Sequence, residues 1–410
     1  MIHPQAIESY LEQNLPAYLN ILQQMVAINS YTVNPSGVNA LADLTAETFA
    51  GLGFTAEKVP SVNPAYGSHL ILTRPGTSDR RIGLVSHLDT VYSPEEEAQN
   101  DFIWREADQR IYGPGTVDIK GGTVSIYMLL AALQEFAPHA FAQITWVILF
   151  DASEERGGID FGELCIDRLD REALACLVFE GGKYEENRFR IVVARKGMAV
   201  YRVTVEGKAA HAGNDHAYGA NAIIQLADVM QQIAAMTDYE RQLTFNVGVV
   251  RGGATTNRVP HQAEALVEMR AFEVDIFEAG IAGMLALNDY STVRSVAGDF
   301  ACRVRVEILT KVPPWSRNPA SERLLNVWQE TAQSMGMTVE PEERGGLSDG
   351  NHVWQHLPTL DGLGPSGANM HCSERSADGS KDQEYVDAAS FVPKTVLNTM
   401  ALLRLIKEAR

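Results

Sequence analysis

The chain reads Arg81-Ile82-Gly83-Leu84-Val85-Ser86-His87-Leu88-Asp89, an apolar run that leads directly into a histidine and an aspartate. The run predicts a buried strand that delivers His87 at its carboxyl end. Because side chains alternate along extended backbone, His87 and Asp89 can face the same side. We therefore expect His87 to bind a metal ion and Asp89 to fix the ring and nearby water without binding the metal itself.

The segments around this run alternate between helix and strand patterns. Amphipathic or strongly periodic helices are predicted at 6–25, 40–52 and 121–136, and strands at 69–73, 81–86, 143–150 and 173–179. Such alternation predicts an α/β fold with a mostly parallel central sheet and helices on both faces.

The pattern changes between residues 196 and 309, where the predicted order is strand, helix, strand, strand, helix, strand. That order is typical of a ferredoxin-like α+β unit. A chain of 410 residues is also too long for one ordinary core. We therefore predict a large domain formed by residues 1–195 and 310–410, with residues 196–309 as an inserted domain.

Composition narrows the class of protein. The formal net charge of −18 argues against nucleic acid and anionic membranes as partners, since both require basic surfaces. The chain has only four cysteines, without close pairs, which is the pattern of a reducing compartment. Without a recognisable signal peptide or transmembrane run, we expect a cytoplasmic enzyme.

Asp118 lies in a glycine-rich loop that enters the periodic helix. A carboxylate at a helix start is often only a cap. The glycines around it, however, allow the backbone to pack close to a bound ion. Because a carboxylate has two oxygens, Asp118 is assigned as a bridge between two cations.

Glu154 and Glu155 follow the predicted strand 143–150. Adjacent carboxylates repel each other and lose solvation unless cations or protons compensate, although a solvated loop is the simpler alternative. The carboxyl ends of strands are where open α/β sheets place their sites. We therefore assign Glu154 as the general base for the attacking water and Glu155 as a metal ligand.

Glu180 follows a further strand, and His371 lies in a late loop. A lone loop histidine is more often plain surface, which is how His69 and His352 are interpreted. Two zinc ions need a bridge and about two further protein ligands each. His87 with Glu180, and Glu155 with His371, meet that count around the bridging aspartate, so two zinc ions per subunit are expected. Cobalt or manganese are possible substitutes.

This ordered series of His-x-Asp, Asp-x-Lys-Gly-Gly, Glu-Glu, an acidic ligand and a late histidine resembles the co-catalytic zinc aminoacylase/carboxypeptidase family. That family includes acetylornithine deacetylase, succinyl-diaminopimelate desuccinylase and bacterial glutamate carboxypeptidase. The resemblance covers nearly the full chain. It implies a dinuclear catalytic domain, an inserted ferredoxin-like lid or dimerisation domain, and hydrolysis of an amide next to a free carboxylate. A homodimer is expected, because the inserted sheet leaves edge strands to be covered.

The same resemblance implies roles in the inserted domain and in the glycine-rich loop at 345–350. His211 is expected to polarise the scissile carbonyl, often from the opposite subunit, unless it is only a helix-entry histidine. Asn257 and Arg270 are expected to contact the substrate. The guanidinium of Arg270 would hold the substrate carboxylate, unless Arg270 is an ordinary strand cation. Gly346 and Ser348 belong to the loop that resembles the family's substrate loop.

The chain also departs from the family pattern. Lys311 precedes Val312 and Pro313 where glutamate-specific relatives place an arginine before a proline, so glutamate specificity does not follow. The polar segment 372–382 is longer than expected and could either shape a pocket mouth or form an exposed loop. We expect a carboxypeptidase-type exopeptidase acting on small peptides or N-acyl amino acids. The alternatives are an N-acyl-amino-acid deacylase, a dipeptidase, or a non-catalytic metal-stabilised dimeric binding protein.

Overall fold

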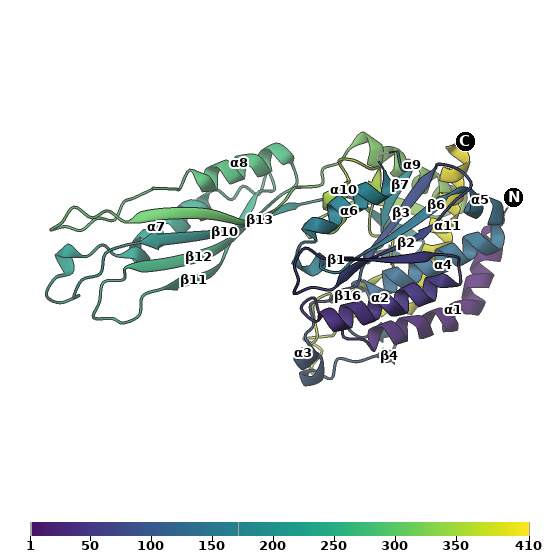
Figure 1. Cartoon of the computed structure of the whole chain (residues 1–410), viewed down its shortest axis with the longest axis horizontal. Coiled ribbons are helices and arrows are strands. Elements are labelled where there is room, and N and C mark those ends of the chain that lie inside the picture. The colour runs from purple at the N-terminus through teal and green to yellow at the C-terminus, as the bar shows by residue number, and fades with distance from the viewer. Residues whose placement is uncertain (1, 171, 410) are drawn as a thin grey trace. The chain divides into compact units, whose positions relative to one another are not determined.

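The computed structural model describes residues 2–170 and 172–409. The chain forms two compact units, both drawn in Figure 1. The larger unit comprises Met1–Val193, Arg317–Glu343 and Ser348–Arg410, and the smaller unit comprises Ala194–Ser316 and Arg344–Leu347. The smaller unit extends beyond the predicted end at residue 309 because its last strand continues to Val312. Its role as a lid or dimerisation domain stays a prediction.

The larger unit is built on a six-stranded sheet with the order β1-β2-β6-β3-β7-β15 (Figure 1). Neighbouring strands are parallel from β6 to β15, whereas β2 runs antiparallel to β6 and β1 antiparallel to β2. The predicted α/β fold with a mostly parallel central sheet is confirmed. The strands are β1 (Thr55–Pro60), β2 (Ser68–Arg74), β3 (Arg81–His87), β6 (Thr145–Asp151), β7 (Ala175–Val178) and β15 (Thr359–Leu360).

Both faces of this sheet are covered by helices, which explains why its central strands are almost continuously apolar. In β6, Trp146 and Ile148 face one core while Val147 and Leu149 face the other. Each fully buried side chain of this size contributes about 1.5–3 kcal/mol. The first face packs against α1 (Pro4–Val26), α2 (Pro35–Ala50), α4 (Lys120–Phe136), α9 (Pro319–Ser334) and α11 (Phe391–Glu408). The second packs against α6 (Ile159–Leu169) and α10 (Gly350–Val353).

The helix beginnings show where local chemistry moved the predicted limits. Helix α2 starts five positions before the predicted residue 40, because the Asn34 side chain accepts a hydrogen bond from the Gly37 N–H and caps it. In the smaller unit, the 3-10 turn η2 (His216–Tyr218) precedes the first helix, α7 (Ala222–Ala235). Asn221 caps α7 in the same way.

Two small sheets were not predicted. One has the order β16-β17-β5-β4, and the other β14-β9-β8. The first places residues 385–387 directly against residues 110–112 through antiparallel pairing. Consequently the segment that contains His371 lies beside the loop that contains Asp118. The strands are β4 (Arg105–Ala107), β5 (Arg110–Tyr112), β8 (Tyr184–Glu185), β9 (Arg188–Arg195), β14 (Thr338–Arg344), β16 (Gly367–Ala368) and β17 (Tyr385–Asp387); the remaining short helices are α3 (Pro94–Gln99), α5 (Pro138–Gln143), η1 (Glu154–Arg156) and η3 (Ala388–Ser390).

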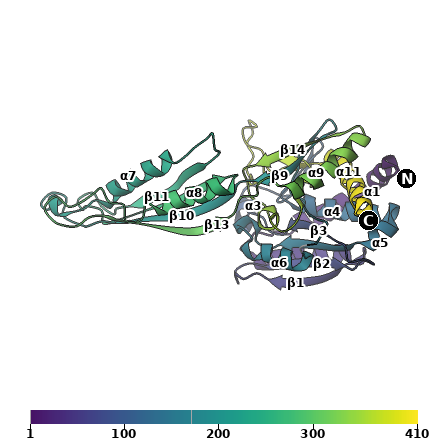
Figure 2. The same cartoon turned by 90° about the horizontal axis from the view of Figure 1, so that it is seen from above.

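The smaller unit has the predicted ferredoxin-like order of elements, and its four strands are antiparallel in the order β11-β12-β10-β13. Both of its helices lie on one face of the sheet (Figure 2). Alternate residues of β10, such as Tyr201 and Val203, point into the core beneath them. The elements are β10 (Gly197–Glu206), α7, β11 (Thr244–Gly252), β12 (Gln262–Ala271), α8 (Val274–Leu285) and β13 (Arg303–Val312). Within the described part of the chain, no helix has the length and apolar character that a bilayer crossing requires.

Candidate metal centre

Three neighbouring parallel strands of the larger unit end at the same edge of the sheet. His87 is the last residue of β3, Glu154 and Glu155 follow the end of β6, and Glu180 lies two residues beyond β7. Because β6, β3 and β7 are adjacent and parallel, their carboxyl ends meet there. The sheet topology therefore gathers four side chains that are almost 100 positions apart in sequence.

Asp118 lies between the two histidines. Its Oδ1 is 3.1 Å from His87 Nε2, and its Oδ2 is 3.3 Å from His371 Nε2. The alternative interpretation as a helix cap is wrong, because α4 has Ile119 at its N-cap and no side-chain capping bond. The peptide bond between Asp118 and Ile119 is cis. The two distances show that each carboxylate oxygen of Asp118 faces a different imidazole, which is the arrangement that a bridging ligand needs.

All five predicted ligands fall into two overlapping groups. Donor atoms of His87, Asp118 and Glu180 lie within 4.8 Å of one another, as do those of Asp118, Glu155 and His371. His371 Nε2 is 3.2 Å from Glu155 Oε2, and His87 Nε2 is 3.8 Å from Glu180 Oε1. Asp118 is common to these two groups, and a third group joins His87 with Glu154 and Glu155.

The charges of the site balance only if positive charge is supplied. Burial raises the pKa of Glu154 well above its usual range, and burial together with Asp118 raises the pKa of Glu155. Hydrogen bonds to Asp118 and Glu155 raise the pKa of His371 to about 11. Burial opposes charge on His87, but hydrogen bonds with the carboxylates of Asp118 and Asp89 raise its pKa well above the usual value.

The direction of these pKa shifts favours protonated imidazoles when no metal is bound. Divalent cations can replace those protons, and two imidazoles with three carboxylates form a donor set that suits zinc. The residues present fit a pair of metal ions.

Asp89 contacts the turn that follows β6 more closely than it contacts the histidine ring. Its Oδ1 accepts the Glu154 N–H at 3.1 Å, and its Oδ2 accepts the Glu155 N–H at 3.3 Å and the Thr32 hydroxyl at 2.7 Å. His87 Nδ1 is 2.9 Å from the main-chain carbonyl of Asp89 and 3.5 Å from its carboxylate. Asp89 therefore fixes the backbone of the predicted base and of one predicted ligand.

The residues expected to recognise substrate lie on the smaller unit, except Ser348, which begins the third segment of the larger unit. His211 is exposed, and its Nδ1 accepts the N–H groups of Gly213 and Asn214 at 3.1 Å each. An exposed neighbour, Asn257, accepts the Ala212 N–H through its main-chain carbonyl. The structure thus brings the predicted polarising histidine and the predicted substrate-binding asparagine together on one surface of this unit.

Arg270, Gly346 and Ser348 already have partners within the chain. The guanidinium of Arg270 donates to both carboxylate oxygens of Glu268 and to the Gly345 carbonyl. The Gly346 carbonyl accepts a bond from Arg195, and the buried Ser348 hydroxyl donates to Asp361 at 2.8 Å.

The sequence matches the model of Peptidase family M20/M25/M40 over residues 83–398, most of the chain. The chain belongs to this family. It is 26% identical to carboxypeptidase G2 of Pseudomonas sp. (strain RS-16) over 391 residues, 95% of this chain and 89% of that protein. It is 25% identical to succinyl-diaminopimelate desuccinylase of Burkholderia vietnamiensis over 406 residues, 94% of this chain and 100% of that protein.

A solved relative, the Bacillus subtilis YXEP protein, is described as a dinuclear metal binding peptidase of this family. It superimposes with a TM-score of 0.67 at 15% identity, covering 96% of this chain and 99% of that one, and at this identity the likeness shows the fold. The predicted family and the predicted enzyme class are confirmed. The protein is a metallohydrolase of amide bonds, with carboxypeptidases and deacylases among its relatives.

The polar segment 372–382 of this peptidase has two parts. Its first residues line a cavity of about 330 Å³ beside His371, together with residues of α3. They are held in place because Ser373 donates to Glu96, and Gln383 donates to the carbonyls of Asn100 and Ser373. The tip at 377–380 is exposed. The segment therefore both lines a pocket and ends in an exposed loop.

Other features of the peptidase were not predicted from sequence patterns. His69 is buried, which contradicts its interpretation as surface, and it lies 3.1 Å from Asp151 and 3.0 Å from Asp160. Burial lowers its pKa, but these carboxylates outweigh burial and raise the pKa to about 9. His352 is half-buried, with its Nε2 3.0 Å from the Gly157 carbonyl. A buried glutamate at 384 likewise carried no recognisable signal.

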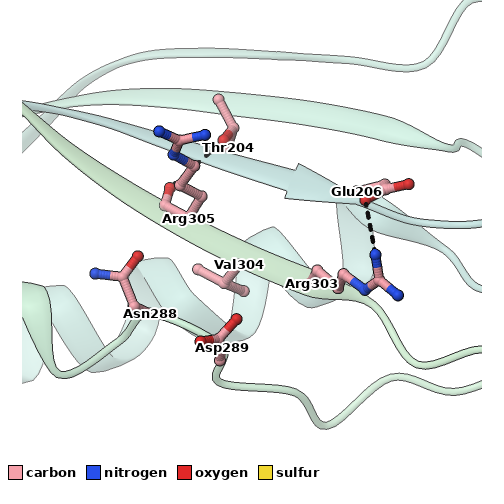
Figure 3. Close-up of a pocket in the computed structure, with 7 residues that line it drawn as sticks. All are labelled: Thr204, Glu206, Asn288, Asp289, Arg303, Val304 and Arg305. Carbon is pink, nitrogen blue, oxygen red and sulfur yellow. Dashed lines mark hydrogen bonds and ion pairs between the residues drawn. The ribbon is translucent and has the colours of Figure 1, made fainter.

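A further cavity of about 430 Å³ lies on the smaller unit, over β10 and β13 (Figure 3). Most of its lining residues have polar or charged side chains, and Arg303 pairs there with Glu206 at 3.9 Å. It contains none of the predicted site residues, so it is not a candidate for the catalytic site. The remaining lining residues are Thr204, Asn288, Asp289, Val304 and Arg305.

Proposed function

We propose that this family member is a dinuclear zinc-dependent exopeptidase of carboxypeptidase type. The observation that carries the proposal is the pair of donor groups that share Asp118. His87 and Glu180 would hold one ion with it, and Glu155 and His371 the other. Bound there, two zinc ions would polarise the scissile carbonyl and lower the pKa of the attacking water. Cobalt or manganese would serve as substitutes.

Glu154 is the proposed general base. Its carboxylate belongs to a group with donor atoms of His87 and Glu155, yet it is not needed to complete either ligand set. Glu154 takes a proton from water as the water oxygen bonds to the carbonyl carbon. It then delivers that proton to the amide nitrogen as the C–N bond breaks, giving a free amine and a carboxylic acid, which ionises to the carboxylate. Asp89 keeps the Glu154 backbone in place during both transfers.

His211 is proposed to stabilise the oxyanion. Because its Nδ1 accepts two backbone N–H groups, the neutral ring carries its proton on Nε2, which is then a donor. A donor aimed at the developing charge is worth about 3–4 kcal/mol.

Asn257, Arg270 and the loop with Gly346 and Ser348 are proposed to hold the carboxylate end of the substrate. Arg270 is the charged member of this set, and it now forms a bidentate pair with Glu268. A substrate carboxylate must therefore share or displace that pairing.

The proposed substrates are small peptides or N-acyl amino acids with a free carboxylate. Carboxypeptidase and desuccinylase relatives match the chain at similar identity, so deacylase and dipeptidase activities remain alternatives. Zinc-reconstituted protein should be assayed against N-acyl amino acids and dipeptides, with matched amides that lack the free carboxylate. Hydrolysis restricted to substrates with the carboxylate supports the proposal. Metal retention without any hydrolysis would favour the binding-protein alternative.

We also propose a homodimer formed through the smaller unit. Strand β11 lies at the edge of its sheet, with Val249 and Val250 exposed, and Ile223 and Ile224 are exposed at the start of α7. An open apolar edge of this kind is normally paired or covered. Sedimentation that gives only the monomer mass at micromolar concentration would contradict the dimer. The four unpaired cysteines support the proposed cytoplasmic location.

A further inference from the structure

Glu384 is a buried carboxylate directly behind the metal centre. The residue is 0% exposed. Its Oε1 accepts the N–H of Val117 at 2.9 Å and the N–H of Asp118 at 3.1 Å, and its Oε2 accepts the Tyr92 hydroxyl at 2.7 Å. The Oε1 atom of Glu384 therefore contacts the backbone of the predicted bridging ligand, Asp118, and of its neighbour, Val117.

The arrangement repeats what Asp89 does on the other side of the site. Each carboxylate is buried, accepts two consecutive backbone N–H groups, and accepts one side-chain hydroxyl. The N–H groups that donate to Asp89 belong to Glu154 and Glu155. Those that donate to Glu384 belong to Val117 and Asp118. Both turns carry predicted site residues, and neither turn is part of a strand.

Glu384 is also connected to His371. Its main-chain N–H donates to the Cys372 carbonyl at 2.8 Å, which closes the loop between the two residues. The next residues form β17, which pairs with β5. Glu384 therefore joins the segment that carries His371 to the turn that carries Asp118, and these two side chains lie 3.3 Å apart.

We propose that Glu384 is a positioning residue that fixes Asp118, and through it His371, in the geometry required to hold metal. This inference rests on the proposed dinuclear function. Asp118 shares the site with the carboxylates of Glu155 and Glu180, which repel it, and with the imidazoles of His87 and His371, which attract it. The hydrogen bonds that Glu384 accepts from the N–H groups of Val117 and Asp118 fix the backbone of Asp118 among these opposing charges. A buried glutamate that served only the core would not need to face the N–H of a ligand.

Three substitutions separate the effect of the length of the Glu384 side chain from the effect of its charge. Glu384→Asp keeps the charge but withdraws the carboxylate by one methylene, so it no longer spans to the Asp118 backbone. Glu384→Gln loses the charge, yet its amide oxygen can still accept both N–H groups while its nitrogen donates to Tyr92. Glu384→Ala loses both. The matched control is Glu374→Gln, an exposed carboxylate of the same loop that pairs with Lys381.

Metal affinity is measured by competition with a chelator, and the visible absorption of the cobalt-loaded protein reports ligand geometry. We expect the Asp and Ala variants to hold metal about 10–100-fold more weakly, with an altered cobalt spectrum. The Gln variant should lose less than about 10-fold, and the control should match the wild type. Far-UV circular dichroism and urea unfolding of the metal-free proteins show that folding is retained.

Two outcomes have separate meanings. If the wild type itself retains no metal, the proposed dinuclear function fails. If the wild type retains metal and folded Glu384→Asp binds it as tightly with an unchanged cobalt spectrum, the positioning role is overturned. The Asp variant keeps the inference testable if the Ala variant does not fold.

Discussion

Replacing Asp89 by asparagine turns one of its two carboxylate acceptors into a donor at the centre of the site. The amide nitrogen can occupy either oxygen position. In the Oδ1 position it faces both the Glu154 N–H and His87 Nδ1, which lies 3.5 Å away. In the Oδ2 position it can donate to the Thr32 hydroxyl, and only the Glu155 N–H loses its acceptor. The second orientation is favoured because a hydroxyl accepts as well as donates.

The magnitude follows from that single lost bond. A buried N–H without an acceptor costs about 1–3 kcal/mol, so the free energy of unfolding of Asp89→Asn should fall by about that amount. Because the lost bond belongs to Glu155, metal held by Glu155 and His371 should weaken by about 10–100-fold. The Glu154 N–H keeps its acceptor, so the base stays aligned. An excess of zinc should therefore restore most of the turnover rate.

Urea unfolding of the metal-free protein and chelator competition measure the two effects. Asp43→Asn is the control, because Asp43 is an exposed carboxylate paired with Lys58. The reasoning is refuted if Asp89→Asn unfolds at the wild-type urea concentration and holds both ions as tightly. It is also refuted if excess zinc leaves the turnover rate of Asp89→Asn at its lowered value, because the base itself would then be displaced.

Three further perturbations test other parts of the site. Glu154→Gln should lower kcat by about 10²–10⁴-fold while metal content, measured by emission spectrometry, stays at the wild-type level; loss of metal would make Glu154 a ligand instead. His211→Ala should lower kcat by about 10²–10³-fold without changing urea stability, because the residue is exposed; wild-type kcat would exclude it from the reaction. His69 has its pKa raised to about 9 in the folded protein, so its charged form stabilises the fold below the unfolded value near pH 6.5 and loses this contribution as the pH rises through 9. With both proteins zinc-loaded, the difference in the free energy of unfolding between the wild type and His69→Gln should therefore narrow between about pH 7 and pH 10. A difference that does not depend on pH would show that His69 does not titrate in this range.

The central sheet and the positions of its ligands could be predicted because both depend on local patterns. The apolar runs before His87 and Glu154 are long enough to identify strands, and parallel strands bring their carboxyl ends together without further information. The donor atoms of the predicted ligands lie close together for the same reason, and their roles as ligands stay predictions. Asp118 and His371 were harder, since neither lies on a strand. They were assigned from ligand counting and from the order of motifs.

Residues that act through the backbone left no pattern to recognise. Glu384 lies in a polar segment, and its partners at positions 117 and 118 are more than 260 positions away. His69 sits in an apolar strand, where a lone histidine gave no sign of its two aspartates. The Glu384 contacts depend on the short strands β5 and β17, which are set by tertiary pairing rather than by propensity.

The position of each ligand explains which ones need such support. His87 ends a central strand, so the sheet itself holds its backbone. Glu155 and Asp118 lie on turns, where nothing in the backbone ladder resists the repulsion between neighbouring carboxylates. Those are the two turns whose N–H groups are held by Asp89 and by Glu384. A carboxylate acceptor suits this task because its bonds to N–H groups are stronger than those of a neutral oxygen. Removal of either carboxylate should therefore loosen metal while leaving His87 in place.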